Sequence, residues 1–383
     1  MTGSIPLSIL DLSPVPRDGT AADALRNSID LAKVAERAGY RRYWVAEHHL
    51  VTGVASASPP VLVALIADAT ERIRVGSGAT LLPKTPPVQV AEQYGTVAAI
   101  HPRRVDLGLG RFDLHRLLRA LRDGKTGKPP GAAGPARVVD GLLVPGTARV
   151  IGDPSLIAHF ATLIGISPDD PVPDYDAQVG EILDYIAGRA CRPNGEALHV
   201  LPAEGADLDV WILGSSAGAS AEAAGRRGLP FAANYHVQPG TVLETVAAYR
   251  EAFRPSPRLE RPYLVVSADV VVAETDERAR ELAAPYGQWV LDIRSGRGAR
   301  PYVTPEEAKA RVWTDEERAM VADRVDTQFV GSPDTVVERL GTLARVTGAD
   351  ELLVTTITTE HADRVASTEL LARAWSERKV VAA

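Results

Sequence analysis

The chain has 383 residues, of which 45% are hydrophobic and 24% are charged, as in ordinary soluble globular proteins. Its formal net charge of −7, from 49 acidic and 42 basic residues, argues mildly against a nucleic-acid partner. No apolar run reaches the roughly 18 residues that a membrane span needs, and no signal peptide is expected. The single cysteine, Cys191, excludes an internal disulfide and a thiolate-rich metal site, so we expect a cytoplasmic protein with no metal in its site.

Strand-like and helix-like patterns alternate along the chain. Residues 8–15 predict a strand, and residues 21–39 carry apolar side chains at helical spacing, with Gly39 placed as the C-terminal cap. Further strands are predicted at 40–47, 72–82, 103–110, 208–216, 230–236, 262–273 and 351–358. Further helices are predicted at 58–70, 86–100, 216–228, 241–253 and 332–348. Eight strand patterns, each followed by a helical one, predict an α/β fold, a (β/α)8 barrel; a doubly wound sheet is the alternative.

Two segments interrupt this alternation. Residues 122–208 begin with a Gly/Pro-rich stretch and contain a weak helical pattern at 176–188. Residues 285–325 interrupt the seventh unit. We expect both to be insertions, after strands four and seven, on the face of the barrel where the strands end, and to form mobile lids over a substrate.

Three adjacent ionisable residues, Glu47, His48 and His49, directly follow an apolar strand. In a barrel this position lies at the mouth, where active sites form, so His48 is a candidate functional residue; the alternative is a histidine hydrogen-bonded within the rim. Neighbouring strand residues face opposite sides. Glu47 is therefore expected to face away from His48, as a structural carboxylate paired with Arg74 or Arg104.

A second group of polar residues follows strands four and five. Ser215 and Ser216 stand where a strand meets a helix, a position suited to an anion such as phosphate, although serine is also a common helix N-cap. Arg111 ends the stretch "LGLGR" and would supply a cation beside them. That stretch is not a dinucleotide-binding motif, because Asp113 takes the place of the third glycine.

Taken together, the stretches "AEHHLVTGVASASP", "RIRVGSGATLLP", "VAEQYGTVAAIHPRRVDLGLGR", "WILGSS", "LGLPFAANYH" and "FVGSP" resemble the bacterial luciferase-like flavin-dependent monooxygenases. The resemblance implies one (β/α)8 domain over residues 1–383, with insertions at 122–208 and 285–325. It also implies reduced FMN as the cofactor, which reacts with O2 to give a C4a-hydroperoxyflavin that oxygenates a small organic substrate. Because the chain shows no reductase domain, a separate flavin reductase would supply the reduced FMN.

The resemblance also assigns roles to particular residues. His48 falls at the catalytic position, Gly78–Ala79 falls where relatives have a non-proline cis peptide beneath the flavin, and the remaining cofactor-binding positions are Glu47, Arg111, Gly214, Ser215 and Ser216. The family further implies a homodimer, whereas the expectation of no nucleic-acid and no membrane partner comes from charge and composition. Where relatives usually have a small turn after "GLGR", this chain has Phe112, Asp113 and His115, so the family's substrates cannot be carried over. Two alternatives stay open: an oxidoreductase that uses cofactor F420 on the same barrel, and a non-catalytic flavin-binding partner subunit.

Overall fold

The computed structural model describes residues 5–82, 85–111, 114–123, 135–146 and 154–377. Eight parallel strands form a closed barrel, which confirms the predicted (β/α)8 fold. In chain order the barrel strands are β1 (Leu7–Asp11), β2 (Arg42–Val45), β3 (Arg74–Ser77), β5 (Val105–Gly110), β8 (Leu208–Gly214), β9 (Phe231–Asn234), β10 (Leu264–Val272) and β12 (Glu351–Thr355). Neighbouring strands in this order pair with one another, and β12 pairs with β1 to close the ring.

Four short strands lie outside the ring of eight. They are β4 (Thr80–Leu81), which pairs with β5, the antiparallel pair β6 (Arg137–Val139) and β7 (Leu142–Val144), and β11 (Phe329–Gly331), which pairs in parallel with the last residues of β10. The third predicted strand is therefore divided into β3 and β4, and the Gly78–Ala79 peptide between them is cis, as expected.

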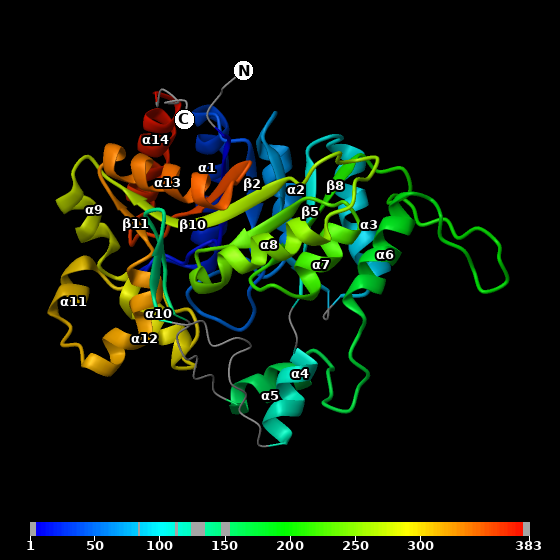
Figure 1. Cartoon of the computed structure of the whole chain (residues 1–383), viewed down its shortest axis with the longest axis horizontal. Helices are drawn as coiled ribbons and strands as arrows, with labels where there is room; N and C mark the ends of the chain where they lie inside the picture. Colours follow the sequence, from blue (N-terminus) through cyan, green and yellow to red (C-terminus); the bar gives the residue numbers. More distant parts are fainter. Residues whose placement is uncertain (1–4, 83–84, 112–113, 124–134, 147–153, 378–383) are drawn as a thin grey trace.

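Helices surround the barrel (Figure 1). Those that follow the sequence alternation are α1 (Ala21–Ala38), α2 (Pro59–Ala69), α3 (Pro87–Ile100), α6 (Tyr175–Ile186), α7 (Ala219–Arg226), α8 (Val242–Ala252), α13 (Pro333–Thr347) and α14 (His361–Glu377). The others are α4 (Leu114–Arg122), α5 (Pro154–Leu163), α9 (Asp276–Ala283), α10 (Tyr286–Arg294), α11 (Pro305–Ala310), α12 (Asp315–Val325) and the 3-10 turn η2 (Pro239–Thr241). Among the described residues, no helix is both long and apolar enough to cross a membrane.

Local sequence signals set the ends of the first helix, α1. Thr20 accepts a hydrogen bond from the Asp23 amide, and Asp23 accepts one from the Thr20 amide, so the two residues form a capping box. At the other end Gly39 takes a left-handed conformation with φ of 88°, which confirms its predicted role as the cap.

The strands separate two apolar layers, because successive side chains alternate between the ring of helices and the barrel interior. Ile9, Tyr43 and Val45 belong to the outer layer, between strands and helices. Leu10 and Trp44 belong to the inner layer, which also contains Trp211, Val265 and Leu353 from strands across the barrel. At the C-terminal ends of the strands this inner layer continues into the buried face of α10, formed by Tyr286, Trp289, Val290 and Leu291.

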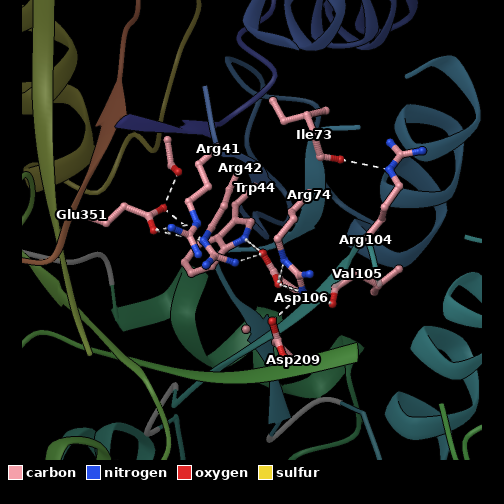
Figure 2. A network of polar contacts seen from close by, with 12 residues as sticks. Arg41, Arg42, Trp44, Ile73, Arg74, Arg104, Val105, Asp106, Asp209 and Glu351 are labelled. Atoms are coloured by element: carbon pink, nitrogen blue, oxygen red, sulfur yellow. Dashed lines mark hydrogen bonds and ion pairs between the residues drawn. The ribbon is translucent and has the colours of Figure 1, made fainter. Parts of the chain in front are cut away.

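A charged network fills the other end of the barrel interior, where the strands begin (Figure 2). Asp106 is fully buried; it pairs with Arg42 at 2.8 Å and with Arg74 at 2.6 Å, and accepts a hydrogen bond from Trp44 Nε1 at 2.9 Å. Arg42 also pairs with Glu351 at 3.1 Å. The charges at this end of the barrel are thus paired with one another, which indicates a structural role.

Of the two segments predicted as insertions, α10, α11 and α12 of 285–325 and α5 of 122–208 lie on the side of the barrel away from α14, whereas α6 lies beside α3 (Figure 1). Residues 285–325 form α10, α11 and α12. Within 122–208, α6 packs against α3 as part of the outer ring, whereas α5 packs on α4 through a separate apolar cluster that includes Leu114, Leu118 and Ala161. The buried face of α10 does not suit a mobile lid, because mobile segments make few buried apolar contacts. Mobility of the described parts of 122–208 stays a prediction.

Candidate functional site

A cavity of about 480 Å³ opens at the end of the barrel where the strands finish. This volume is within the usual range of small-molecule and cofactor sites, roughly 300–1,000 Å³. All eight residues predicted for the site line it: Glu47, His48, Gly78, Ala79, Arg111, Gly214, Ser215 and Ser216. The fold therefore brings together residues from four different segments, whereas their individual roles remain predictions.

His48 lines the cavity just beyond β2. Its amide donates to the Ser56 carbonyl at 3.0 Å, which fixes the backbone. Its ring nitrogen Nδ1 is buried, and no hydrogen-bond partner lies near it among the described residues. Burial, reinforced by His49 and opposed by Glu47, lowers the pKa of the His48 imidazole to about 4. The ring is therefore neutral at pH 7. The alternative role, a histidine held in the barrel rim by hydrogen bonds, is not supported at Nδ1, because this atom makes no hydrogen bond to the described residues.

Glu47 also lines the cavity, so the prediction that it faces away from His48 is wrong. Strand β2 ends at Val45, and beyond that residue the alternation of strand faces no longer applies. Glu47 Oε1 lies 2.7 Å from His49 Nε2, and Oε2 accepts a hydrogen bond from the Leu81 amide at 2.9 Å. This carboxylate thus ties the segment after β2 to β4.

The predicted partners of Glu47, Arg74 and Arg104, lie elsewhere. Arg74 is the first residue of β3, and Arg104 directly precedes β5. Both therefore lie at the opposite end of the barrel from the segment after β2. Arg74 pairs with Asp106, and Arg104 donates to backbone carbonyls, among them that of Ile73 at 3.1 Å. The predicted pairing was wrong because Glu47 follows the C-terminal end of its strand, whereas both arginines lie at the N-terminal ends of theirs. The length of the barrel therefore separates Glu47 from them.

The polar end of the cavity lies where β5 and β8 finish. Arg111 follows β5 directly and is exposed, and Ser215 and Ser216 stand in the turn between β8 and α7. Helix α7 begins at Ala219 with Gly218 as its N-cap, so neither serine is the cap that the alternative interpretation required. Thr241 donates to the Ser215 carbonyl at 2.6 Å and holds this turn in place. A guanidinium and two hydroxyls beside a helix N-terminus are suited to bind a phosphate.

The apolar floor of the cavity comes from the barrel strands. Gly78 lies between β3 and β4, and a side chain here would meet the Leu10 side chain at 2.8 Å and Trp44 at 3.2 Å. The loop after β2 closes on the segment that follows α10, because the Gly53 amide donates to the Ala299 carbonyl at 2.8 Å. A Cβ at Gly53 would lie 2.2 Å from the backbone of the residue after Ala299. The close approach of these two loops therefore requires glycine.

Several cavity residues were not predicted as site residues. Asp269 of β10 and Arg324 of α12 face the cavity, together with Trp289 of α10 and His236 beyond β9. Asp269 could have been found, since it is the single charged residue in the apolar stretch of β10. Arg324 gives no such signal, because α12 has the charged composition of an ordinary surface helix. None of the described residues of 122–208 lines this cavity, and Phe112 and Asp113 lie outside the described residues.

The free energy of unfolding should fall as the pH is lowered from about 6.5 towards 4. Burial lowers the pKa of His48 to about 4 and that of His236 to about 3, whereas an unfolded histidine titrates near 6.5. Below pH 6.5 the unfolded chain binds protons that the folded chain does not, so the stability present above this pH is lost as the pH falls. Urea unfolding at pH 7 and pH 5 measures the loss.

The variant His236→Gln should reduce this pH dependence, since one of the two buried imidazoles is removed. His199→Gln is the matched control, because the His199 side chain is 69% exposed. A His236→Gln chain that loses as much stability between pH 7 and pH 5 as the unaltered chain would contradict the assignment.

A parallel (β/α)8 barrel whose C-terminal strand ends enclose a polar-lined cavity has the architecture of a barrel enzyme. The chain belongs to the luciferase-like monooxygenase family, whose profile matches residues 5–113 and 178–351. It is 36% identical to the protein YvbT of Bacillus subtilis over 375 residues, 97% of each chain. It is 32% identical over 370 residues to a luciferase-like monooxygenase of Escherichia coli strain K12, 96% of each chain. Family membership places the chain among the monooxygenase-type oxidoreductases.

Solved structures agree with this assignment. The apo form of MsnO8 is 30% identical and superposes with a TM-score of 0.76, covering 97% of this chain and 98% of MsnO8. Two more distant proteins share the fold. The oxygenating constituent of 3,6-diketocamphane monooxygenase from Pseudomonas putida, in complex with FMN, has a TM-score of 0.63 at 18% identity, with 99% and 100% of the two chains covered. An F420-dependent secondary alcohol dehydrogenase has a TM-score of 0.60 at 12% identity, with 97% and 99% covered.

Proposed function

We propose that this chain is a flavin-dependent monooxygenase that uses reduced FMN and O2 to oxygenate a small organic substrate. The observation that carries the proposal is the composition of the cavity at the C-terminal ends of the barrel strands. It combines an apolar floor, a cationic and hydroxyl-bearing end, and a neutral histidine whose Nδ1 has no partner among the described residues. The apolar floor is suited to a flat ring system and the polar end to a phosphate tail, while the histidine is placed to exchange a proton with a bound group.

The residues present fit FMN. Arg111, Ser215 and Ser216 would hold the phosphate, while Gly78 and Ala79 would lie against the ring system. When bound, the flavin supplies the activation of O2, and the protein supplies binding, orientation and protons. Trp289 and Ile293 of α10, and Gly298 and Ala299 of the loop after it, line the cavity and would restrict the access of water, which limits side reactions of activated oxygen. A neutral His48 can accept a proton at pH 7 and return it.

The F420 alternative is suggested by a fold shared with F420-dependent enzymes, among them an alcohol dehydrogenase at 12% identity. The monooxygenase assignment has stronger support, because the relatives above 30% identity include a luciferase-like monooxygenase over nearly its whole length. The two alternatives differ in their need for oxygen: a F420-dependent enzyme would turn over without O2. Retention of His48 in the cavity supports an enzyme over a non-catalytic partner subunit.

Arg111→Ala should weaken FMN binding by about tenfold or more, because a hydrogen bond to a charged group contributes roughly 1.5–3 kcal/mol. Fluorescence titration of FMN at fixed salt measures the effect. Arg226→Ala is the matched control, since Arg226 lies at the far end of α7 and pairs with Glu222 at 3.3 Å. Equal FMN affinity in the Arg111→Ala and Arg226→Ala chains would remove Arg111 from the phosphate site.

Three further expectations remain proposals: a separate flavin reductase, a cytoplasmic location and a homodimer. The dimer is supported by apolar side chains exposed on the neighbouring helices α2 and α3. On α2, Val61 and Leu65 are 60% and 51% exposed, and Ile100 at the end of α3 is 70% exposed. Exposed apolar side chains that gather on one face are typical of protein–protein contacts.

A further inference from the structure

A buried arginine lines the cavity at the end away from the proposed phosphate site. Arg324 of α12 is only 5% exposed, and its guanidinium lies over the rings of Tyr286 and Trp289, 5.3 Å and 5.5 Å from their centres. Arg111 and the serines stand where β5 and β8 end. Arg324 lies instead against Asp269 of β10, on the opposite side of β9 from those strands.

The hydrogen bonds of Arg324 are incomplete. An arginine side chain has five N–H donors. Nη2 donates to Asp269 Oδ2 at 3.3 Å, whereas Nε is buried with no acceptor near it among the described residues. Most buried polar atoms in proteins are hydrogen-bonded, so Arg324 is an incompletely bonded cation among the residues that line the cavity.

Asp269 is a poor partner for this cation. The Tyr286 hydroxyl donates to the same oxygen, Oδ2, that accepts from Arg324, so one carboxylate oxygen serves two donors. Burial raises the pKa of Asp269 despite the nearby guanidinium. The neighbouring His236, whose Nδ1 lies 2.7 Å from Ser267 Oγ, adds no charge at neutral pH because its pKa is lowered. Asp269 therefore does not use the full hydrogen-bonding capacity of the guanidinium.

We propose that the substrate is an organic acid whose carboxylate binds Arg324 while its apolar body packs against Trp289, Ile293 and Val51. These three side chains line the same cavity as Arg324, and Trp289 lies directly against its guanidinium. The planar guanidinium fork matches the two oxygens of a carboxylate, which gives a strong and directional contact. The inference rests on the proposed function, because it names the substrate class of that site.

A purely structural role is the competing explanation: Arg324 would simply fasten α12 to β10. The same segment contains a matched control, Arg294 of α10, which is also 5% exposed. It pairs with Asp323 and does not line the cavity. A structural role predicts that loss of either arginine lowers the melting temperature and leaves ligand selectivity unchanged.

The experiment measures the affinity of the whole chain for 3-phenylpropanoate and for its uncharged amide by calorimetry, with saturating FMN to fill the phosphate site. We expect the unaltered chain to bind the carboxylate at least tenfold more tightly than the amide. Arg324→Gln should abolish this preference, Arg324→Lys should keep part of it, and Arg294→Gln should keep it in full. Asp269→Asn should strengthen carboxylate binding, because it removes the competing carboxylate.

Equal affinities for the two probes in the unaltered chain would overturn the inference, as would an unchanged preference in Arg324→Gln. If Arg324→Gln does not fold, Asp269→Asn decides: weaker or unchanged carboxylate binding overturns the inference. An Arg324→Gln chain that loses FMN affinity and keeps the probe preference would assign Arg324 to the cofactor instead. Failure of the unaltered chain to bind FMN would contradict the proposed function alone, since the probe preference can be measured in the flavin-free chain.

Discussion

Replacing His48 with alanine should reduce oxygenation by about 10²–10⁴-fold, the range of a lost general acid–base group. The imidazole lines the cavity, is neutral at pH 7, and has a buried Nδ1 with no partner among the described residues. FMN affinity should persist, because the proposed phosphate contacts at Arg111, Ser215 and Ser216 lie elsewhere. A larger share of the O2 consumed should then be released as hydrogen peroxide, since transfer to the substrate slows while oxygen activation continues.

The coupling ratio of product formed to flavin oxidised is the measurement, and Glu47→Gln is the comparison variant. Glu47 joins His49 to the Leu81 amide, so Glu47→Gln should lower the melting temperature more than the turnover rate. Glu47 also raises the pKa of His48, and its loss should lower that pKa further. A wild-type oxygenation rate and coupling ratio in the His48→Ala enzyme would contradict the assignment of His48 as the group that exchanges a proton.

Replacing Asp106 with asparagine should lower the free energy of unfolding by about 3–5 kcal/mol, the usual effect of breaking a buried ion pair. Asp106 is fully buried and compensates Arg42, which is 3% exposed, while also accepting from Trp44 Nε1 (Figure 2). Its loss leaves the Arg42 guanidinium with Glu351 as its remaining ion-pair partner among the described residues. Urea unfolding followed by circular dichroism measures the change.

Asp209→Asn provides the control within the same network. Asp209 pairs with Arg74 at 2.7 Å, but its side chain is 51% exposed, so solvent screens the pair and the loss should stay below about 1 kcal/mol. The folded Asp106→Asn chain should still bind FMN, because Asp106 lies at the opposite end of the barrel from the cavity. Unfolding midpoints that match between Asp106→Asn and Asp209→Asn would show that burial of this pair has no special effect.

The sequence predicts the barrel well because each parallel strand, buried on both faces, is a short apolar run. These runs alternate along the chain with segments of helical periodicity. It also predicts that residues following strands, such as His48 and Arg111, line one cavity, because strand ends converge on one face. The partner of Glu47 was missed because periodicity carries no information about which end of a neighbouring strand an arginine occupies. Arg324 was missed for a different reason. It reaches the cavity from α12, and its place there depends on tertiary packing that local sequence does not encode.

The inner apolar layer of the barrel passes without a break into α10, and this continuity bears on how the enzyme can be re-engineered. Trp289 and Tyr286 share one cluster with Trp44 and Leu353, so exchanging residues 285–325 for a relative's segment would demand matching changes inside the barrel. The pair α4 and α5 has its own small apolar cluster and is the more portable module. Chimeras that exchange α4 and α5 should therefore be tolerated more readily. Substitutions in α10 require compensating substitutions in the barrel strands that form the floor of the cavity.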